Sequence, residues 1–306
     1  MPNTLLRDIG LLALLALIWS SSFTVIKVGV ETMPPTTLAM LRVVVGAFIL
    51  YGWLKIKGHS LPTERRVWVT FFLIGLFGNA IPFVLINWGE QKIASGLAAI
   101  LIAAMPLVTL VLGRIFSDEI LNARRLIGVL CGFSGVVVLI GPSQFLTLGD
   151  EVLRQLAVAS AAVCYAIAAI LFRKLPKAKP LEHGAGVLIA SSMTLIPAAF
   201  LFEQPWTVSY TAESVGVFVY LGVFPTALAT LLLIVVIASR GATFLSLNNY
   251  MIPVMGVLWG YLFLDEILTF EGAISLSMIV AGIAIAGIGP GTHENAARQK
   301  SAVKRV

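Results

Sequence analysis

An internal repeat is the feature that most constrains how this chain of 306 residues can fold. The stretch that begins at Pro106 and ends in Asp118-Glu119-Ile120-Leu121 returns, beginning at Pro253 and ending in Asp265-Glu266-Ile267-Leu268. The same displacement of 147 positions relates Phe71 to Phe218, Gly75 to Gly222, Phe77 to Phe224, Ala80 to Ala227, Gly113 to Gly260 and Gly135 to Gly282. A register kept without insertion indicates one structural unit present twice. We expect the units to occupy residues 1–141 and 142–290, followed by a basic tail at 291–306.

The amino-acid composition places both units in a lipid bilayer. Apolar residues make up 58% of the chain and charged residues only 12%, with a mean hydropathy of +0.97. A soluble domain carries about 25% charged residues. The first apolar run, residues 9–30, is too long for a cleaved leader and is expected to remain as a helix. Cys131 and Cys164 lie inside apolar runs, so we expect small hydrophobes there, and no cofactor or metal site.

Apolar stretches of about 20 residues are long enough to cross a bilayer as helices. The sequence contains ten such stretches, five in each unit, so we predict an all-α integral membrane protein. The predicted helices are 9–30, 35–54, 67–88, 93–113, 122–140, 153–173, 184–202, 214–237, 242–263 and 270–289.

The distribution of lysine and arginine predicts the orientation of these helices. Of the 21 basic residues, 17 fall on one side of the predicted membrane, and Lys92 and Arg154 fall on the other. Basic residues mark the cytoplasmic side, so both termini are expected in the cytoplasm. The net charge of +6 therefore reflects the basic residues on the cytoplasmic side of the membrane, and no nucleic-acid partner is expected. Because five is odd, the second unit enters the membrane inverted, an arrangement typical of secondary transporters.

Several motifs resemble EamA-type members of the drug/metabolite transporter superfamily. They are Ile18-Trp19-Ser20-Ser21-Ser22-Phe23 with Lys27, Leu41-Arg42-Val43, and the doubled Pro…Gly…Asp-Glu-Ile-Leu stretch. The resemblance spans residues 9–289 and implies a multi-pass protein of the cell (inner) membrane that exports small organic solutes. The sequence is most similar to bacterial exporters of amino acids, including aromatic ones. Export of cationic drugs or other metabolites is the alternative, and a channel or inert scaffold is a third.

Arg42 is the strongest candidate for a substrate contact. It lies seven residues into the second predicted helix, where a charge must face a cavity or a partner. A guanidinium can bind a substrate carboxylate with two parallel hydrogen bonds. The competing interpretation is structural, with Arg42 binding carbonyls exposed by a broken helix. Lys27 lies near the end of its helix, and we expect its amine to reach the membrane interface.

Other polar residues within predicted spans are candidates for the same substrate site. They are Trp19, Ser22, Asn79, Tyr165, Asn248 and Asn249. The serines at 20–22 can equally serve helix packing. Pro106 and Pro253 occupy matching positions, and each frees a backbone carbonyl about one turn earlier. Interrupted helices at matching positions point to a transport site, so we assign these prolines a gating role, with a passive kink as the alternative.

An enzyme is not expected from this sequence. Gly132-Phe133-Ser134-Gly135 matches a short string of intramembrane serine proteases, but all three histidines fall outside the predicted helices. With Gly128, this segment instead predicts a helix-packing face. Every Asp and Glu falls outside the predicted helix interiors, with Glu31 and Glu90 at their outer rims, so no proton-coupling residue is predicted. The expected partners are a small-molecule substrate and the lipid bilayer, and the chain is treated as a monomer.

Overall fold

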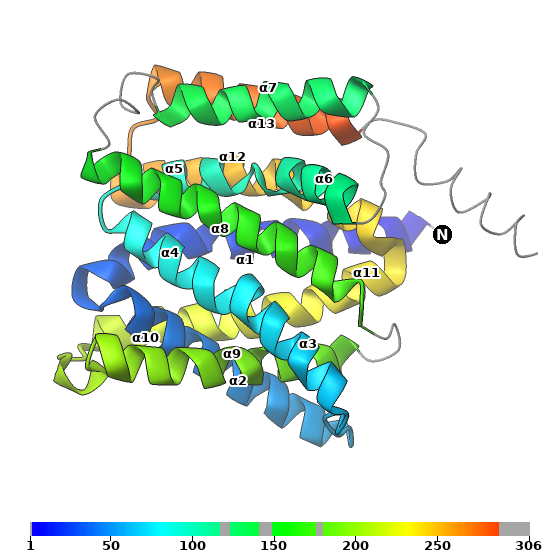
Figure 1. Ribbon diagram of the computed structural model, residues 1–306, viewed down its shortest axis with the longest axis vertical. Coiled ribbons are helices and arrows are strands. Elements are labelled where there is room, and N and C mark those ends of the chain that lie inside the picture. The colour runs from blue at the N-terminus through cyan, green and yellow to red at the C-terminus, as the bar shows by residue number, and fades with distance from the viewer. Residues whose placement is uncertain (1, 117–122, 141–148, 176–179, 288–306) are drawn as a thin grey trace, which may run out of the picture.

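The computed structural model describes residues 2–116, 123–140, 149–175 and 180–287, and this part of the chain is helical throughout, without strands (Figure 1). The helices are α1 (Pro2–Thr32), α2 (Pro35–Ile56), α3 (Arg65–Gly75), η1 (Leu76–Ala80), α4 (Ile81–Glu90), α5 (Ser95–Ile102), α6 (Met105–Phe116), α7 (Ala123–Ile140), α8 (Asp150–Phe172), α9 (Pro180–Phe202), η3 (Pro205–Thr207), α10 (Ala212–Leu221), η4 (Gly222–Leu228), α11 (Ala229–Leu245), α12 (Asn248–Leu264) and α13 (Phe270–Gly287). The predicted tail at 291–306 lies outside the described residues.

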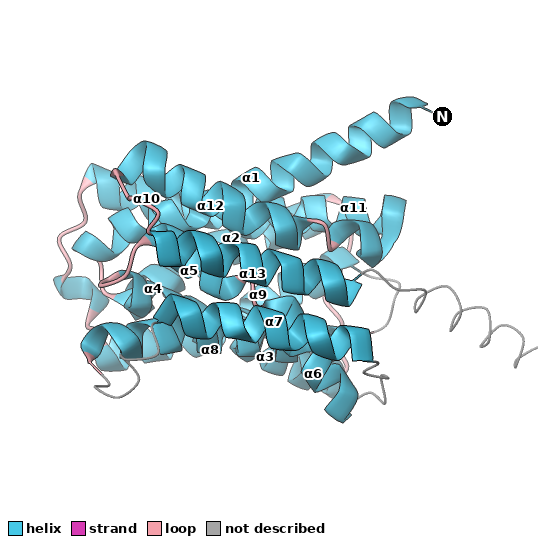
Figure 2. Ribbon diagram, turned by 90° about the horizontal axis from the view of Figure 1, so that it is seen from above, coloured by secondary structure: helices cyan, strands magenta, loops and turns pink. Residues whose placement is uncertain are grey.

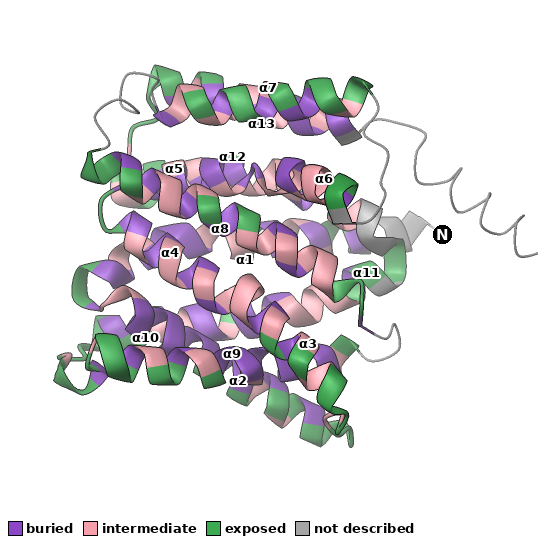
Figure 3. Cartoon of the chain, viewed as in Figure 1, coloured by how far each residue is buried: buried purple, intermediate pink, exposed green. Residues whose placement is uncertain are grey.

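Exposed and buried residues alternate along the helices of the bundle (Figure 3), and both sets include many large apolar side chains. Phe48 and Phe202 are 80% and 81% exposed, whereas Leu15 and Phe71 are fully buried. Large apolar surfaces of this kind are stable in lipid and not in water. Among the described residues, eight helical stretches are long and apolar enough to cross a membrane, and Phe270–Ala286 forms a shorter apolar helix. The chain is a multi-pass membrane protein, whereas the count of ten helices stays a prediction.

Helices α7 and α13 lie side by side at one edge of the bundle (Figure 1), where glycines bring their backbones together. A Cβ placed on Gly128 would lie 2.6 Å from the Gly282 carbonyl oxygen, and one on Gly282 would lie 2.6 Å from the Gly128 oxygen. Further along, Ser275 donates a hydrogen bond to the Gly135 carbonyl at 2.8 Å. The predicted glycine packing face is confirmed, and the pairing makes the two helices antiparallel.

We expect Gly282→Ala to destabilise this helix pair by about 1–2 kcal/mol, because the added methyl group overlaps backbone atoms that cannot rotate away. The measurement is the apparent melting temperature of the detergent-solubilised protein. Gly10→Ala is the control, because a Cβ on Gly10 would meet nothing within 4 Å. Equal melting temperatures for both variants would contradict the close approach of α7 and α13.

Helices α2 and α9 form a second antiparallel pair, held at both ends by polar contacts. At one end, Glu203 follows α9 and caps the start of α2: its carboxylate accepts hydrogen bonds from the backbone nitrogens of Thr36 at 2.9 Å and Thr37 at 2.7 Å. A carboxylate at a helix N-terminus is favourable because it pairs with free N–H groups and the helix dipole. At the other end, His59 faces Glu182 at 3.6 Å.

Two of the predicted helices differ from the observed ones. The predicted helix 93–113 is broken at Ala103 and Ala104, between α5 and α6. This break lies just before Pro106, which lacks the N–H that would bind the carbonyl of Ile102. The predicted turn before residue 242 is wrong, because α11 continues to Leu245 and the chain turns at residues 246–247. Arg240 therefore lies within a helix, and its Nε donates to Asp8 of α1 at 2.7 Å.

Two π-helical segments occupy matching positions in the two halves of the chain. Segment η4 covers residues 222–228, and subtracting the 147-residue displacement gives 75–81, a range that contains η1 (76–80). A proline accompanies each segment and removes a backbone donor: Pro225 lies within η4, and Pro82 lies two residues after the end of η1. Wide turns of this type are frequent at functional sites. The matched pair supports the internal repeat and directs attention to the surrounding side chains.

The second Asp-Glu-Ile-Leu motif has a clear structural role. Asp265 ends α12 in the left-handed conformation, with φ of 52°, which Asp tolerates better than most residues and which reverses the chain. Glu266 then accepts hydrogen bonds from the backbone nitrogens of Ser95 at 2.7 Å and Gly96 at 3.0 Å, and from the Ser95 hydroxyl at 3.0 Å. A residue of the second half thus caps α5 of the first half. The matching Asp118 and Glu119 lie outside the described residues.

Candidate functional site

Arg42 lies inside the bundle on α2, with only 5% of its surface exposed. Its guanidinium carbon lies 3.8 Å from the centroid of the Phe83 ring on α4. Its Nε donates a hydrogen bond to the Thr226 hydroxyl on η4 at 3.0 Å. Thr226 is the only hydrogen-bond acceptor for Arg42 among the described residues, which leaves Nη1 and Nη2 available for an anionic group.

Thr226 connects Arg42 to the break in the neighbouring helix. Pro225 lacks an N–H, so the carbonyl of Leu221, four residues earlier, loses its helical partner. The Thr226 hydroxyl donates to this carbonyl at 2.8 Å while accepting the bond from Arg42. Both interpretations of Arg42 therefore have a basis here: Nε is anchored to the broken helix, and the terminal nitrogens are not.

Tyr165 is a predicted site residue that lies near Arg42. It lies on α8, near enough for the charge of Arg42 to act on its hydroxyl. It also packs against both of the large apolar clusters of the bundle, one around α1, α4 and α5 and the other around α2 and α9. The Arg42 group, defined here as Arg42, Phe83, Tyr165 and Thr226, lies where these clusters meet. Phe83 was not predicted; its position directly after Pro82 was the available signal.

Asn79 lies at the position of the first half that matches Thr226, but it binds a different helix. Its Nδ2 donates to the hydroxyl of Ser191 on α9 at 3.0 Å. Ser191 in turn donates to the carbonyls of Val187 at 2.8 Å and Gly75 at 3.2 Å. In each half, a polar side chain in the π-helical segment thus joins the crossing helix, α9 or α2. Asn79 has a packing contact here and is not part of the Arg42 group.

The polar residues of α1 join that helix to its neighbours. The hydroxyls of Ser20, Ser21 and Ser22 donate back to carbonyls of their own helix. Ser20 also accepts a hydrogen bond from the Trp259 indole at 2.9 Å, and Ser21 shares one with Tyr220 at 2.8 Å. Ser20 and Ser21 thus join α1 to α12 and α10, as the packing interpretation expects, while Ser21 also lines a hollow. Trp19 packs in an apolar cluster around Leu15, Ile18 and Ala229.

The remaining predicted residues lie near the start of α12 or at the prolines. Asn248 is 2% exposed, and neither atom of its amide group has a hydrogen-bond partner in the described part of the chain. No hydrogen bond or ring contact among the described residues joins Asn248 or Asn249 to Arg42. Pro106 follows the break between α5 and α6, whereas α12 continues through Pro253. The two prolines therefore differ in their effect on the helix, and their gating role stays a prediction.

Lys27 and Glu90 each have an environment that was not predicted. The Lys27 Nζ donates to the carbonyls of Glu90 at 2.7 Å and Ile93 at 2.9 Å, at the end of α4 and in the turn that follows it. Cations at helix C-termini are favourable because they bind the last free carbonyls. Glu90 is the last residue of α4, as expected for the rim of a span, but 0% of its surface is exposed. The sequence therefore contains a buried carboxyl group, contrary to the prediction.

Two hollows in the bundle are lined by residues outside the Arg42 group. One, of about 750 Å³, runs between α1, α10 and α12 and is lined mostly by apolar residues, together with Ser21, Tyr220 and Trp259. The other, of about 470 Å³, is lined by residues of α5, α7, α8 and α12, including Gln155, and by Glu266. Arg42 lines neither hollow and is buried, so its guanidinium is not accessible from either of them in this conformation.

The chain is a multi-pass helical bundle in which a buried arginine lies beside helix breaks at matching positions of the two halves. This arrangement is typical of membrane transporters. Comparison with known proteins supports this class. The chain belongs to the EamA-like transporter family, whose pattern matches residues 7–141 and, a second time, residues 154–288.

Relatives along nearly the whole chain carry names of the same kind. An uncharacterized transporter of Archaeoglobus fulgidus is 28% identical over 278 residues, covering 90% of this chain and 96% of the relative. The uncharacterized inner membrane transporter YedA of Escherichia coli is 25% identical, covering 93% and 92% of the two chains. A protein of known crystal structure has the same fold, with a TM-score of 0.65 at 21% identity, covering 92% of this chain and 97% of that one.

Proposed function

We propose that this transporter exports amino acids from the cytoplasm by alternating access, with residues 1–141 and 142–290 as two inverted units that move around a central site. Arg42 binds the carboxylate of the substrate, and Phe83 and Tyr165 flank its side chain. Apolar and aromatic amino acids fit such surroundings best. Both termini, including the basic tail at 291–306, lie in the cytoplasm, and one chain suffices for transport.

The observation that carries this proposal is the state of the Arg42 side chain. A buried guanidinium is costly in a membrane unless a partner binds it. Only Nε is bound to a residue that the structure describes, at Thr226, while the flat face lies on Phe83. A carboxylate fits the two free terminal nitrogens because it can accept two parallel hydrogen bonds.

The pairing of helices supports the inverted arrangement. The 147-residue displacement relates α2 to α9 and α7 to α13, and the members of each pair run antiparallel. Equivalent helices of two units related by a twofold axis in the membrane plane must run in opposite directions. The π-helical segments η1 and η4 provide the matching breaks that such transporters use around a site.

The test is a counterflow screen with purified protein in liposomes. Vesicles are loaded in turn with each of the twenty amino acids, and uptake of the same labelled amino acid is measured against empty vesicles and against vesicles without protein. We expect saturable counterflow for a subset dominated by apolar or aromatic amino acids. Absence of counterflow for all twenty would overturn the proposed substrate class.

Export of cationic compounds is a second candidate, and Glu90 is the observation that favours it. A buried carboxylate is the group expected to bind a cationic cargo. The same screen therefore includes lipophilic cations, loaded as the amino acids are. Counterflow of cations without counterflow of amino acids would replace the first candidate by the second.

The topology can be tested with single cysteines in a background without Cys131 and Cys164. Position 58 follows α2 and position 209 lies between α9 and α10, at opposite ends of the bundle (Figure 1). Both positions are exposed. With cytoplasmic termini, Gly58→Cys should resist a membrane-impermeant thiol reagent in intact cells and Ser209→Cys should react. The reverse pattern would invert the orientation, and labelling of both from outside would contradict the arrangement of the bundle.

A further inference from the structure

Glu90 is an acid held entirely inside the bundle without a bonding partner. It ends α4, and its side chain has 0% exposure. Neither carboxyl oxygen has a hydrogen-bond partner among the residues that the structure describes. Burying a carboxylate without hydrogen bonds is far more costly than burying the neutral acid. This conformation therefore suits Glu90 with a proton bound.

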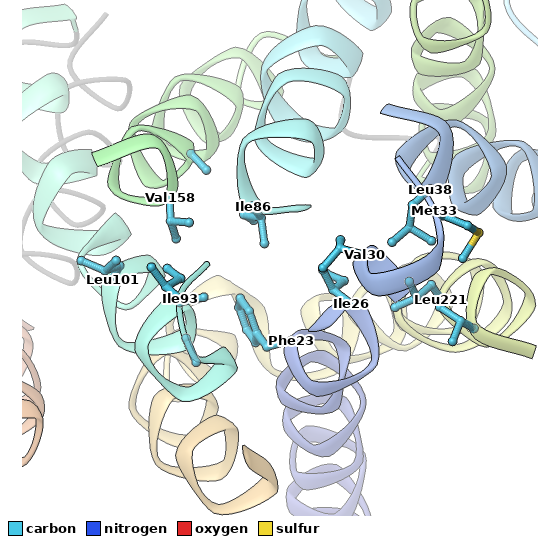
Figure 4. Close-up of a cluster of buried hydrophobic side chains, with 14 residues drawn as sticks. Phe23, Ile26, Val30, Met33, Leu38, Ile86, Ile93, Leu101, Val158 and Leu221 are labelled. Carbon is cyan, nitrogen blue, oxygen red and sulfur yellow. The ribbon is translucent and has the colours of Figure 1, made fainter. Parts of the chain in front are cut away.

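Apolar residues flank Glu90 in the chain. Ile86, four residues earlier, and Ile93, three residues later, belong with Val158, Leu101 and Phe23 to one buried cluster (Figure 4). Apolar side chains supply no hydrogen bonds to an ionised carboxylate.

Three charged side chains from other elements lie near enough to act on Glu90: Lys27 from α1, Arg42 from α2 and Glu266 from the segment before α13. The Lys27 amine binds the Glu90 and Ile93 carbonyls, and Glu266 caps α5. On α8, Arg154 binds the carbonyl of Trp88. Helix α5 and segment η1 contribute no charged residue.

We infer that Glu90 is the proton-coupling residue of this transporter. The neutral acid fits the conformation described here, and release of its proton leaves a carboxylate that requires water or one of the two nearby cations, Lys27 and Arg42. The Lys27 amine uses two of its three N–H groups on the carbonyls that join the end of α4 to α1, so turning it toward the carboxylate alters this contact. Proton binding at Glu90 thus selects between two arrangements of α1 and α4. This inference rests on the proposed transport function and supplies its driving force.

A hollow close to Glu90 in the chain offers a route for the proton. The hollow of about 470 Å³ is lined by Ile93, Gln155 and Glu266. Gln155 is 3% exposed, and its Oε1 has no hydrogen-bond partner among the described residues. A polar hollow with unpaired acceptors can hold water. Water there would connect the end of the bundle with the residues that surround Glu90.

The first test does not require a substrate. Infrared difference spectra of the purified protein in lipid, taken between neutral and alkaline pH, should contain the carbonyl stretch of a protonated carboxyl group. This band should be absent from Glu90→Gln and present in Glu31→Gln, which changes an exposed acid at the end of α1. An identical band in wild type and Glu90→Gln would overturn the inference.

The second test measures driven transport with the membrane potential clamped at zero. For one proton per substrate, a gradient of one pH unit supports about a tenfold substrate concentration ratio across the membrane. We expect this ratio for wild type and Glu31→Gln, and a ratio near one for Glu90→Gln, which should still exchange substrate without a gradient. Glu90→Asp, which keeps a titratable group, should retain a response to the gradient.

Two outcomes overturn the inference: exchange by wild type that ignores the pH gradient, and a response to the gradient that survives Glu90→Gln. Both leave the proposed transport function intact. If the wild type moves no amino acid, the proposed function fails, and the infrared band still decides whether Glu90 holds a proton. Loss of cation counterflow in Glu90→Gln, with the gradient response kept, would assign Glu90 to cargo binding instead.

Discussion

Arg42→Ala is expected to reduce transport of a free amino acid by about 10- to 150-fold. The variant loses a hydrogen-bonded contact to a charged group, worth roughly 1.5–3 kcal/mol, and each 1.4 kcal/mol corresponds to about a factor of ten. Arg42→Lys keeps the charge but loses the planar group that binds a carboxylate twice, so it should be impaired to a smaller degree. The measurement is counterflow of an amino acid and of its amide at matched protein content.

Two controls separate substrate binding from a structural role of Arg42. An amide substrate lacks the carboxylate, so its transport should be affected much less by Arg42→Ala. Thr226→Val removes the acceptor of the Arg42 Nε and the donor to the Leu221 carbonyl, but leaves the guanidinium in place. If Arg42 only anchors the broken helix, Thr226→Val and Arg42→Ala will each reduce transport of the amino acid and of its amide by the same factor. Arg42 would then no longer be assigned to substrate binding.

Glu266→Ala is expected to destabilise the protein by about 2–3 kcal/mol. The variant removes the acceptor for two backbone N–H groups and one hydroxyl at the start of α5, and a charged acceptor of this kind is worth more than a neutral one. The apparent melting temperature in detergent should fall by roughly 3–8 °C.

Glu266→Gln keeps one acceptor oxygen without the charge, so its apparent melting temperature should lie between those of wild type and Glu266→Ala. Asp265→Asn is the matched control, because Asn tolerates the left-handed conformation of Asp265 equally well. Its side chain is exposed, so its melting temperature should stay close to wild type. A Glu266→Ala variant as stable as Asp265→Asn would mean that the cap contributes little to the folded state.

Much of the architecture follows from the sequence because it depends on local composition and spacing. The apolar runs predict membrane helices, since every backbone polar group in lipid must be bonded within its own segment. The glycines at 128, 132 and 135 predicted a close helix contact because small residues alone permit it. Pro106 predicted a nearby helix break because its ring removes a backbone donor. Arg42 was singled out because a charge in a span must have a partner.

What depends on contacts between distant segments could only come from the tertiary structure. The partner of Arg42 is 184 residues away, and Thr226 attains that role because Pro225 frees a carbonyl beside it. Glu266 looked like part of a turn, yet it caps a helix of the other half. In the sequence, Glu90 lies just after a predicted span, where an exposed residue would be expected. In the structure its side chain is buried near a cluster that contains residues of α1 and α8. Burial of a side chain depends on which helices pack against its own, and hydropathy along one chain does not contain that information.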